Sequence, residues 1–383
     1  MKIFHGTTVP DSLAFLVGLP TFLQKQGDEV AIWSSPGPGL DRFVEREGCI
    51  GYSVAMARAI SPLRDLQACV RLIRLFRRTQ PDIVHAHTPK AGLLGMIAAR
   101  LVKVPIRIYH IHGFPFITAK GWKRWLLTTT ERISARCATH VIAVGSGMRQ
   151  IAIQECICSA PKVRVLHHGT ASGIDAVNHF NPDRIEQGLV DALRRHIGIP
   201  PGAPVVGFVG RLARDKGVEE LVAAWRLLAV WKPALRLVMV GGVDARDGIP
   251  EERIAEWMAT PGIHLLGHVD DVAPLYLLFD VLALPTYGEG FGNVLLEASA
   301  MRVPVVASRI PGCSDAVIDG VTGSLVELRN VSELARVIGL YLDDPILRER
   351  HGQNGRQRVL RDFAPLDVFC SLLETYRSIR NHG

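Results

Sequence analysis

The chain has 383 residues, of which 48% are hydrophobic and 21% charged, with a formal net charge of +7. This composition is that of a globular protein of two or three domains, and it excludes a low-complexity chain or a solenoid of repeats. No run approaches the ~20 apolar residues of a membrane-spanning helix, and the apolar stretch at 13–23 is expected to pack on a sheet rather than to be a signal peptide.

The basic residues are concentrated in the first half. Residues 1–185 hold 23 Lys and Arg against 12 Asp and Glu, or +11, whereas the remainder holds 21 against 25, or −4. Such a basic half indicates an anionic partner: nucleic acid, a phosphorylated substrate or a membrane surface. The 7 cysteines are scattered without a C-x-x-C pair. We therefore expect reduced thiols in a cytoplasmic protein and no structural zinc.

Strands and helices alternate through the first half of the chain. The predicted strands are 2–4, 30–33, 83–86, 106–111, 141–144 and 163–166, and the predicted helices are 12–26, 63–79, 91–101 and 123–137. This alternation predicts a parallel sheet covered by helices on both faces. Small residues, Asn178 and Pro182 interrupt it at 169–182, where we place the linker between domains.

A second alternating series follows. Its predicted strands are 205–209, 235–240, 263–266, 281–284 and 305–307, its helices 218–230, 251–258 and 294–301, and a last helix spans 366–380. The simplest fold is two doubly wound domains, 1–182 and 183–364. Ligands of such sheets bind beyond the carboxyl ends of the strands, so the predicted site lies in the cleft between the domains.

A glycine-rich loop at 285–293 lies between a buried strand and a helix. Its three glycines allow a close backbone approach to a ligand, and the helix start presents free N–H groups to an anion. Glu289 in the loop is suited to sugar hydroxyls, and Glu297 lies eight residues later. Phosphates together with hydroxyls indicate a nucleotide sugar. The alternative is that Glu297 only caps its helix or forms a salt bridge and the glycines only form a turn.

The turn after strand 205–209 holds two cations. Gly210 ends the strand, and Arg211 and Lys216 lie between it and Gly217. Arg can bind two phosphate oxygens at once and Lys supplies a point charge, so the pair could hold a diphosphate. Salt bridges with Asp215 are the alternative.

The segment G-E-G-F-G-N-x-x-L-E-A, with seven residues between Glu289 and Glu297, resembles the E-x7-E motif of the family 4 glycosyltransferases, which are retaining enzymes of the GT-B fold. This resemblance implies that Glu297 binds the ribose, whereas Glu289 holds the donor sugar. It also implies that the last helix crosses back to the first domain. The backbone of the loop would hold the donor through Gly290, Phe291, Gly292 and Asn293.

G-R-L-x-x-x-K-G is similar to the family's diphosphate motif, which gives Arg211 and Lys216 the role of stabilising the departing nucleotide, with Gly210 beside them. The chain has no Asp-x-Asp pair to hold a metal, and fixed cations can stabilise the leaving charge instead. We therefore predict metal-independent transfer and no cofactor. His112, before Gly113 at a strand end, would contact the transferred sugar by resemblance, although a lone His is more often structural.

The segment H-T-P-K-A-G resembles a subgroup that builds bacterial surface glycans on a polyprenyl diphosphate carrier, including N-acetylhexosamine transferases. His87 and Lys90 in it could face the acceptor. Trp122, Lys123, Arg124 and Trp125 suit a membrane interface, because Trp favours headgroup depth and cations meet anionic lipids. The alternative is that the apolar residues are core and the cations solvated.

Together these patterns predict a retaining GT-B glycosyltransferase that moves an N-acetylhexosamine from a UDP-sugar to a sugar on undecaprenyl diphosphate, peripherally at the cytoplasmic face of the plasma membrane. Two alternatives remain: a glycosyltransferase with a small soluble acceptor, and a GT-B nucleotide-sugar 2-epimerase. A nucleic-acid partner is disfavoured, because the basic residues lack an aromatic stacking platform.

Overall fold

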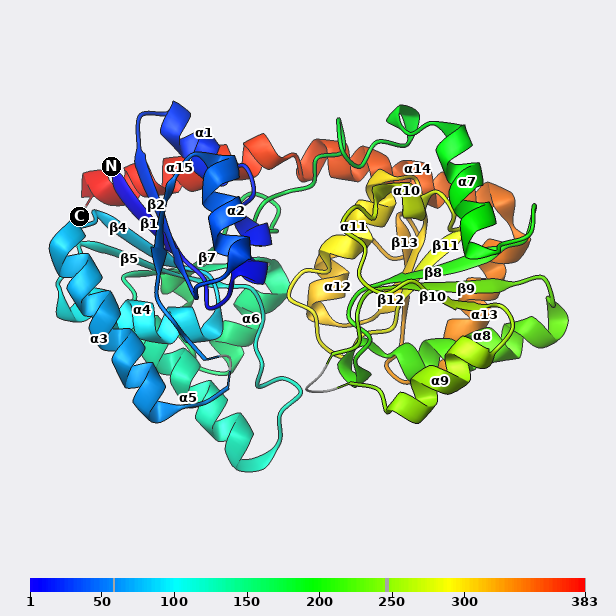
Figure 1. Cartoon of the computed structure of the whole chain (residues 1–383), viewed down its shortest axis with the longest axis horizontal. Coiled ribbons are helices and arrows are strands. Elements are labelled where there is room, and N and C mark those ends of the chain that lie inside the picture. Colours follow the sequence, from blue (N-terminus) through cyan, green and yellow to red (C-terminus); the bar gives the residue numbers. More distant parts are fainter. Residues whose placement is uncertain (58, 245–247, 383) are drawn as a thin grey trace. The chain divides into compact units, whose positions relative to one another are not determined.

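The computed structural model describes residues 1–57, 59–244 and 248–382. It consists of two compact units (Figure 1). The first unit contains Met1–Gly173 and Pro365–Gly383, and the second contains Ile174–Ala364. The division falls within the predicted linker at 169–182, whereas the predicted domain boundary was residue 182.

Within the described residues, the first unit contains a seven-stranded parallel sheet with the order β3-β2-β1-β4-β5-β6-β7. Its strands are β1 (Lys2–Gly6), β2 (Glu29–Ser34), β3 (Ile50–Ser53), β4 (Ile83–Ala86), β5 (Ile106–Ile111), β6 (His140–Ala143) and β7 (Val163–Val165). Its helices are η1 (Pro10–Leu16), α1 (Leu19–Lys25), α2 (Pro38–Glu47), α3 (Pro62–Thr79), α4 (Pro89–Leu101), α5 (Gly121–Cys137), α6 (Ser146–Gln154), η2 (Ala160–Lys162) and α15 (Pro365–His382).

The second unit repeats this plan with the strand order β10-β9-β8-β11-β12-β13 in its described part. The strands are β8 (Val205–Val209), β9 (Arg236–Val240), β10 (Ile263–Leu265), β11 (Val281–Leu284), β12 (Val305–Ser308) and β13 (Gly323–Val326). The helices are η3 (Pro182–Arg184), α7 (Gln187–Ile197), η4 (Arg214–Lys216), α8 (Val218–Trp231), α9 (Glu251–Ala259), α10 (Ala273–Tyr276), α11 (Asn293–Ala300), α12 (Pro311–Ala316), α13 (Val331–Asp343) and α14 (Pro345–Asp362).

Both sheets are doubly wound and parallel, as predicted. Most of their strands are nearly continuous apolar runs because helices bury both faces, whereas the edge strand β3 is largely exposed. In each sheet the strand order reverses once, between β1 and β4 in the first unit and between β8 and β11 in the second. The carboxyl ends of the two strands at such a reversal are where doubly wound folds bind ligands. The loops that follow these four strands are therefore the candidate ligand-binding loops.

The last helix, α15, belongs to the first unit, in agreement with the resemblance to GT-B enzymes. Its inward face packs with residues from β1, β2, β4 and β5 in one hydrophobic core (Figure 1). The residues that α15 contributes are Phe369, Leu372, Leu373, Tyr376 and Ile379. The helix α15 thus completes the hydrophobic core of the first unit.

The predicted helix 12–26 is wrong as a single element. The structure has the 3-10 helix η1 and the α-helix α1, separated at Gly18, whose φ is +80°. This left-handed conformation is accessible to glycine without the penalty of a Cβ atom, and it ends the first helix. The apolar periodicity continued across Gly18 because both short helices bury leucines against the same core.

Candidate functional site

Two loops meet at the carboxyl edge of the second sheet. The first, residues 210–217, follows β8, and the second, 285–293, follows β11. Backbone and side-chain hydrogen bonds tie them together: the Tyr287 N–H and the Thr286 Oγ1–H both donate to the Asp215 carbonyl, at 2.7 and 3.0 Å. Because both loops are fixed to one carbonyl, the charged groups that they hold keep a defined separation.

Gly217 allows the close approach of these loops. It has a φ of +67°, and a Cβ atom there would lie 2.0 Å from the carbonyl oxygen of Pro285. Any side chain would therefore push the loops apart as well as strain the backbone. This glycine is the N-cap of α8, so it also determines where that helix begins.

Lys216 and Glu289 form an ion pair across the two loops. The Lys216 Nζ lies 2.6 Å from the Glu289 Oε2, and the side chains are 14% and 23% exposed. The pair is thus partly shielded but still reachable by a ligand. The sequence predicted both residues as site residues but not that they bind each other.

Arg211 is exposed and is paired with acidic residues. Its Nη1 contacts the Asp244 carboxylate, and its Nη2 lies 3.6 Å from Asp215 Oδ2. The Asp215 pair is the salt bridge that the sequence offered as the alternative for Arg211. Asp244 was not predicted, because it lies beyond β9 and far along the chain from the motif.

Glu297 lies in α11, where the Tyr276 O–H donates to its Oε2 at 2.7 Å. Burial raises the pKa of this carboxyl above its ordinary value. Tyr276, at the end of α10, was not predicted. α11 begins at Asn293 with Gly292 as its N-cap, so Asn293 lies in the first turn of the helix.

The loop 285–293 offers its backbone rather than its aromatic ring to a ligand. The Phe291 side chain is 4% exposed, and its ring packs against that of Phe363 at 5.7 Å between centroids. Gly290 and Asn293, which are partly exposed, are more suitable contacts. Gly312 of α12 lies so close that a Cβ atom there would be 2.2 Å from the Glu289 carbonyl oxygen.

Histidines dominate the corresponding edge of the first sheet. His5 is the penultimate residue of β1, His87 follows β4, and His112 follows β5. Burial lowers the pKa of His112 to about 3, which keeps its ring neutral at pH 7. The ring stacks on Phe15 with centroids 4.4 Å apart.

The predicted acceptor residues are both engaged within the first unit. The His87 side chain is 1% exposed, and Lys90 Nζ donates to the Ala59 carbonyl at 2.5 Å and to Asp65 Oδ1 at 2.7 Å. These positions do not favour direct contact of either side chain with an acceptor. Lys90 instead fixes the loop before α3 to the start of α4.

A hollow of about 460 Å³ lies at the same edge, where β2 and β3 end beside α3. It is lined by Ser35, Pro36, Ala55, Met56, Ala57, Arg64, Gln67 and Arg71. Neither Arg64 nor Arg71 has an ion pair among the described residues. The sequence did not single out this pair, although a spacing of seven residues places two arginines on one face of a helix.

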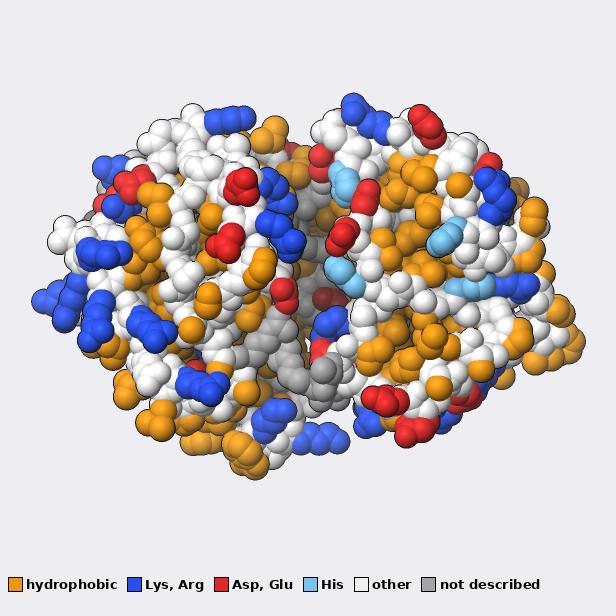
Figure 2. Space-filling view, in the orientation of Figure 1, with side chains coloured by type: hydrophobic (Ala, Val, Ile, Leu, Met, Phe, Trp, Pro, Cys, Tyr) orange, Lys and Arg blue, Asp and Glu red, His pale blue; other side chains and the backbone are white. Residues whose placement is uncertain are grey.

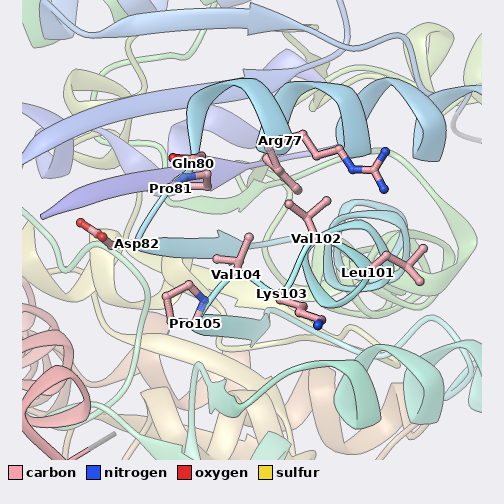
Figure 3. A pocket seen from close by; sticks show the side chains of 10 residues that line it. Arg77, Gln80, Pro81, Asp82, Leu101, Val102, Lys103, Val104 and Pro105 are labelled. Atoms are coloured by element: carbon pink, nitrogen blue, oxygen red, sulfur yellow. The ribbon is translucent and has the colours of Figure 1, made fainter.

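A larger cavity, of about 570 Å³, opens at the opposite edge of this sheet (Figure 3). Its labelled side chains come from the ends of α3 and α4 and from the segments that lead into β4 and β5. Because ligands of doubly wound sheets bind at the carboxyl edge, this amino-terminal cavity is not the candidate site.

The residues predicted to contact the membrane lie in the first turns of α5. Trp122 and Trp125 are 74% and 67% exposed, and Lys123 is also exposed. Arg124 is instead held within the protein, by Glu155 Oε1 at 2.5 Å and by the Phe116 ring. No described helix has the length and apolarity to span a membrane.

Comparisons with known proteins place both units. Residues 21–169 match the family model "Glycosyl transferase 4-like domain", and residues 190–358 match "Glycosyl transferases group 1". The capsular polysaccharide biosynthesis glycosyltransferase CapM of Staphylococcus aureus is 33% identical over 378 residues, which cover 98% of this chain and 97% of CapM.

A second relative is the UDP-Gal:alpha-D-GlcNAc-diphosphoundecaprenol alpha-1,3-galactosyltransferase of Escherichia coli, 27% identical over 80% of this chain and 78% of its own. Among solved structures, HepE of Anabaena in complex with UDP-glucose has a TM-score of 0.82 at 21% identity, covering 99% of this chain and 100% of HepE. The chain therefore belongs to family 4 of the GT-B glycosyltransferases, and it acts in bacterial glycan biosynthesis.

Proposed function

We propose that this glycosyltransferase moves a sugar, with N-acetylhexosamine as the first candidate, from a UDP donor to a sugar on undecaprenyl diphosphate. The name of the E. coli relative gives a diphosphoundecaprenol-linked acceptor, and HepE was solved with UDP-glucose. The anomeric configuration would be retained, and no metal would be required.

The observation that carries this proposal is the pair of Lys216 and Glu289 on two tied loops. A UDP-sugar presents a diphosphate next to a ring of hydroxyls. The ammonium group suits the diphosphate and the carboxylate suits the hydroxyls, and the two groups lie side by side. Donor binding would exchange their mutual contact for one contact each with the donor.

In the transfer step, the bond between the anomeric carbon and the β-phosphate oxygen breaks, and the acceptor hydroxyl oxygen bonds to that carbon on the same face. The hydroxyl proton passes to the departing β-phosphate, so the products are UDP and the lengthened glycan. Lys216 and Arg211 would stabilise the charge that develops on the β-phosphate. Such fixed cations are the basis for proposing metal-independent transfer.

The remaining donor contacts follow from the second unit. Glu297, held by the Tyr276 hydroxyl, would accept hydrogen bonds from the ribose. The backbone of Gly290, Gly292 and Asn293 would face the sugar and phosphate. In the first unit, His112 would contact the transferred sugar.

The hollow beside α3 is suited to the diphosphate of the acceptor. Arg64 and Arg71 are exposed and lie two helical turns apart on one face of α3, with Gln67 between them. Two guanidinium groups at this spacing can each bind one phosphate. This assignment replaces Lys90, whose ammonium group is occupied by Asp65.

Apolar side chains beside this hollow suggest how a lipid carrier would be reached. α3, α4 and α5 pack side by side and all begin at the carboxyl edge of the sheet. Leu63 and Leu66 at the start of α3 are 79% and 63% exposed, and Trp122 and Trp125 lie at the start of α5. Figure 2 shows cationic and hydrophobic side chains interspersed over this part of the first unit. We propose that this surface contacts the cytoplasmic leaflet.

The donor is tested by thermal shift in EDTA with UDP-GlcNAc, UDP-GalNAc, UDP-glucose, UDP-galactose, GDP-mannose and UDP. A ligand at ~100 Kd that binds only the native state adds about 2.7 kcal/mol, which is readily measured. Stabilisation by one UDP-sugar without metal identifies the donor class. No shift with any UDP-sugar in EDTA, but a shift when Mg²⁺ or Mn²⁺ is added, would contradict metal independence.

Acceptor use is tested with a polyprenyl diphosphate-linked sugar and the donor so identified. Transfer to this acceptor but not to the free sugar supports the proposal. Transfer to a soluble sugar alone would favour the first alternative. Conversion of the UDP-sugar to its 2-epimer without acceptor would favour the second.

Membrane contact is tested by flotation with anionic liposomes. The double variant Trp122→Ser/Trp125→Ser should lose binding, because indole side chains anchor proteins at headgroup depth. Trp231→Ser is the matched control, since Trp231 is 85% exposed but lies on α8 of the second unit. Equal flotation of all three proteins would contradict the proposed surface.

A further inference from the structure

Five histidines meet inside the first unit, on three neighbouring strands and the residues that follow them. His5 is paired in register with His85, and His87, His110 and His112 complete the group. The first four side chains are between 0% and 2% exposed, and His112 is half-buried. Such a concentration of buried imidazoles requires a specific arrangement of protons, because every ring nitrogen is either a donor or an acceptor.

Three of these rings form a hydrogen-bonded chain. His5 Nδ1 lies 2.9 Å from His87 Nε2, and His87 Nδ1 lies 3.2 Å from His112 Nε2. His87 is thus the central link, with both of its nitrogens engaged. His85 lies outside the chain, because its Nδ1 is paired with the Tyr376 hydroxyl at 2.6 Å.

Burial lowers the pKa of His5 to about 3, and it lowers the pKa of His87 well below its ordinary value. All three rings are therefore neutral at pH 7, with one proton each. The hydrogen bonds between these neutral rings can point in only two directions along the chain of rings. Either every ring donates from Nδ1 toward His112, or every ring donates from Nε2 toward His5.

The free end at His5 favours one of the two directions. The His5 Nε2 is buried and has no hydrogen-bond partner in the described structure. If the chain ran toward His5, this atom would carry an N–H group with nothing to accept it, which is among the least tolerated states of a buried polar group. If the chain runs toward His112, the same atom is a bare lone pair, which costs less.

We propose that His5 and His87 are positioning residues that hold His112 as the Nδ1–H tautomer, with Nδ1 as a hydrogen-bond donor to a substrate oxygen. This proposal rests on the proposed function, in which His112 contacts the transferred sugar. The Nδ1 of His112 has no protein partner in the described structure and is not among its buried unpaired atoms. The Phe15 ring stacked on the imidazole fixes the plane in which this donor points.

The same nitrogens could instead bind a transition metal. His5, His85 and His87, or His87, His110 and His112, each bring three ring nitrogens within 4.8 Å of one another. A metal would take the lone pairs of His87 and would replace the hydrogen bonds of the chain. Metal content is therefore measured first, on protein purified without an affinity tag that binds metals.

The decisive measurement is the tautomer of His112, read from ¹⁵N–¹H correlations of histidine-labelled protein at pH 7 and assigned with a His112→Gln sample. The proposal expects a protonated Nδ1 and a bare Nε2. A protonated Nε2 on His112, or a stoichiometric transition metal in the purified protein, would overturn it. Neither result depends on catalysis, so a failure of the proposed function is recognised separately by the absence of sugar transfer.

Variants at His87 test the link. His87→Phe removes the donor to His112, and we expect mixed tautomers and a kcat about tenfold lower, which corresponds to one hydrogen bond, with unchanged UDP affinity in the second unit. His87→Asn, whose amide can donate in place of Nδ1–H, should restore both the tautomer and most of kcat. His85→Phe is the matched control, because it removes an equally buried ring that is not part of the hydrogen-bonded chain of His5, His87 and His112. Equal effects of His87→Phe and His85→Phe on kcat and on the His112 tautomer would contradict the proposal, because they would mean that His87 only packs in the core.

Discussion

Lys216 Nζ lies 2.6 Å from Glu289 Oε2, so the two side chains that are proposed to bind the donor neutralise each other's charge. The pairing keeps an ammonium group and a carboxylate in position without leaving either one unpaired in a partly buried site. Under the proposed function, a phosphate oxygen would displace the carboxylate from Lys216 and leave Glu289 available for hydroxyls. Binding of the diphosphate and recognition of the sugar would then be coupled.

Replacement of Lys216 by Ala should lower kcat by about 10²–10³, because one preorganised charge donor to the leaving group is lost. Steady-state kinetics with saturating acceptor measure the effect. Arg214→Ala is the control, since Arg214 lies on the same 3-10 helix with an exposed side chain. A loss below about threefold for Lys216→Ala would contradict the leaving-group role.

Glu289→Ala should abolish most transfer while UDP binds nearly as well as before, because the carboxylate is assigned to the sugar and not to the nucleotide. Calorimetric titration with UDP and with the UDP-sugar separates the two contributions. The affinity for the UDP-sugar should fall toward that for UDP. Parallel loss of affinity for plain UDP would argue against this division of roles.

Gly217→Ala should destabilise the second unit and weaken donor binding. A Cβ atom there meets the Pro285 carbonyl oxygen at 2.0 Å, in addition to the strain of a φ of +67°. Gly202→Ala isolates the strain, because Gly202 has a φ of +72° with nothing within 4 Å of the added Cβ. A left-handed backbone conformation costs a residue with a Cβ atom about 1–2 kcal/mol. Chemical denaturation should show a larger decrease in the free energy of unfolding for Gly217→Ala than for Gly202→Ala. Equal decreases would mean that the two loops can move apart without an energetic cost.

Glu131 makes the stability of the first unit depend on pH. Burial raises its pKa from 4.5 to about 7, while the Tyr109 hydroxyl donates to it at 2.6 Å. Between these two values the folded state binds more protons than the unfolded state, so this group lowers the free energy of unfolding as the pH rises from 4.5 to 7. A shift of this size corresponds to about 3 kcal/mol at and above pH 7.

Glu131→Gln removes that dependence and keeps an acceptor for Tyr109. Urea denaturation should therefore show the variant gaining stability relative to the wild type between pH 5 and pH 8. Glu374→Gln, at an exposed position of α15, is the control and should show no such gain. A constant difference between Glu131→Gln and the wild type across this range would mean that Glu131 is not protonated in the fold.

Most strands were predictable because they are buried on two faces and their sequences are apolar runs. The edge strands β3 and β13 were not predicted. α14 was not predicted, although it is among the longest helices described. Two of its five buried residues are glycines: a Cβ atom on Gly352 would lie 2.1 Å from the Arg302 carbonyl oxygen, and one on Gly355 would lie 3.0 Å from Ser299. A helix that packs through glycines has no apolar periodicity to detect.

The site was predictable where a motif is local and not where contacts are distant. Arg211, Lys216, Glu289 and Glu297 were predicted as candidates because loop, glycines and charge occur together in short segments, and the structure brings Lys216 and Glu289 together. Tyr276 and Asp244 contact them from other elements, and no spacing in the sequence relates these residues to the motifs. His5 was not assigned a role, since its partner His87 follows another strand and their contact depends on the register of the two strands.

The closure of the first core by α15 also dictates an order of events during synthesis. Phe369, Leu372 and Tyr376 complete a core whose other residues leave the ribosome much earlier. Bacterial and eukaryotic ribosomes add about 5–20 residues per second, so the strands of the first unit wait roughly 10–40 s for their last helix. The second unit, by contrast, is complete before translation ends. The part of the protein that is made first is therefore the part that finishes folding last, and during this interval the surface that α15 will cover is open to chaperones.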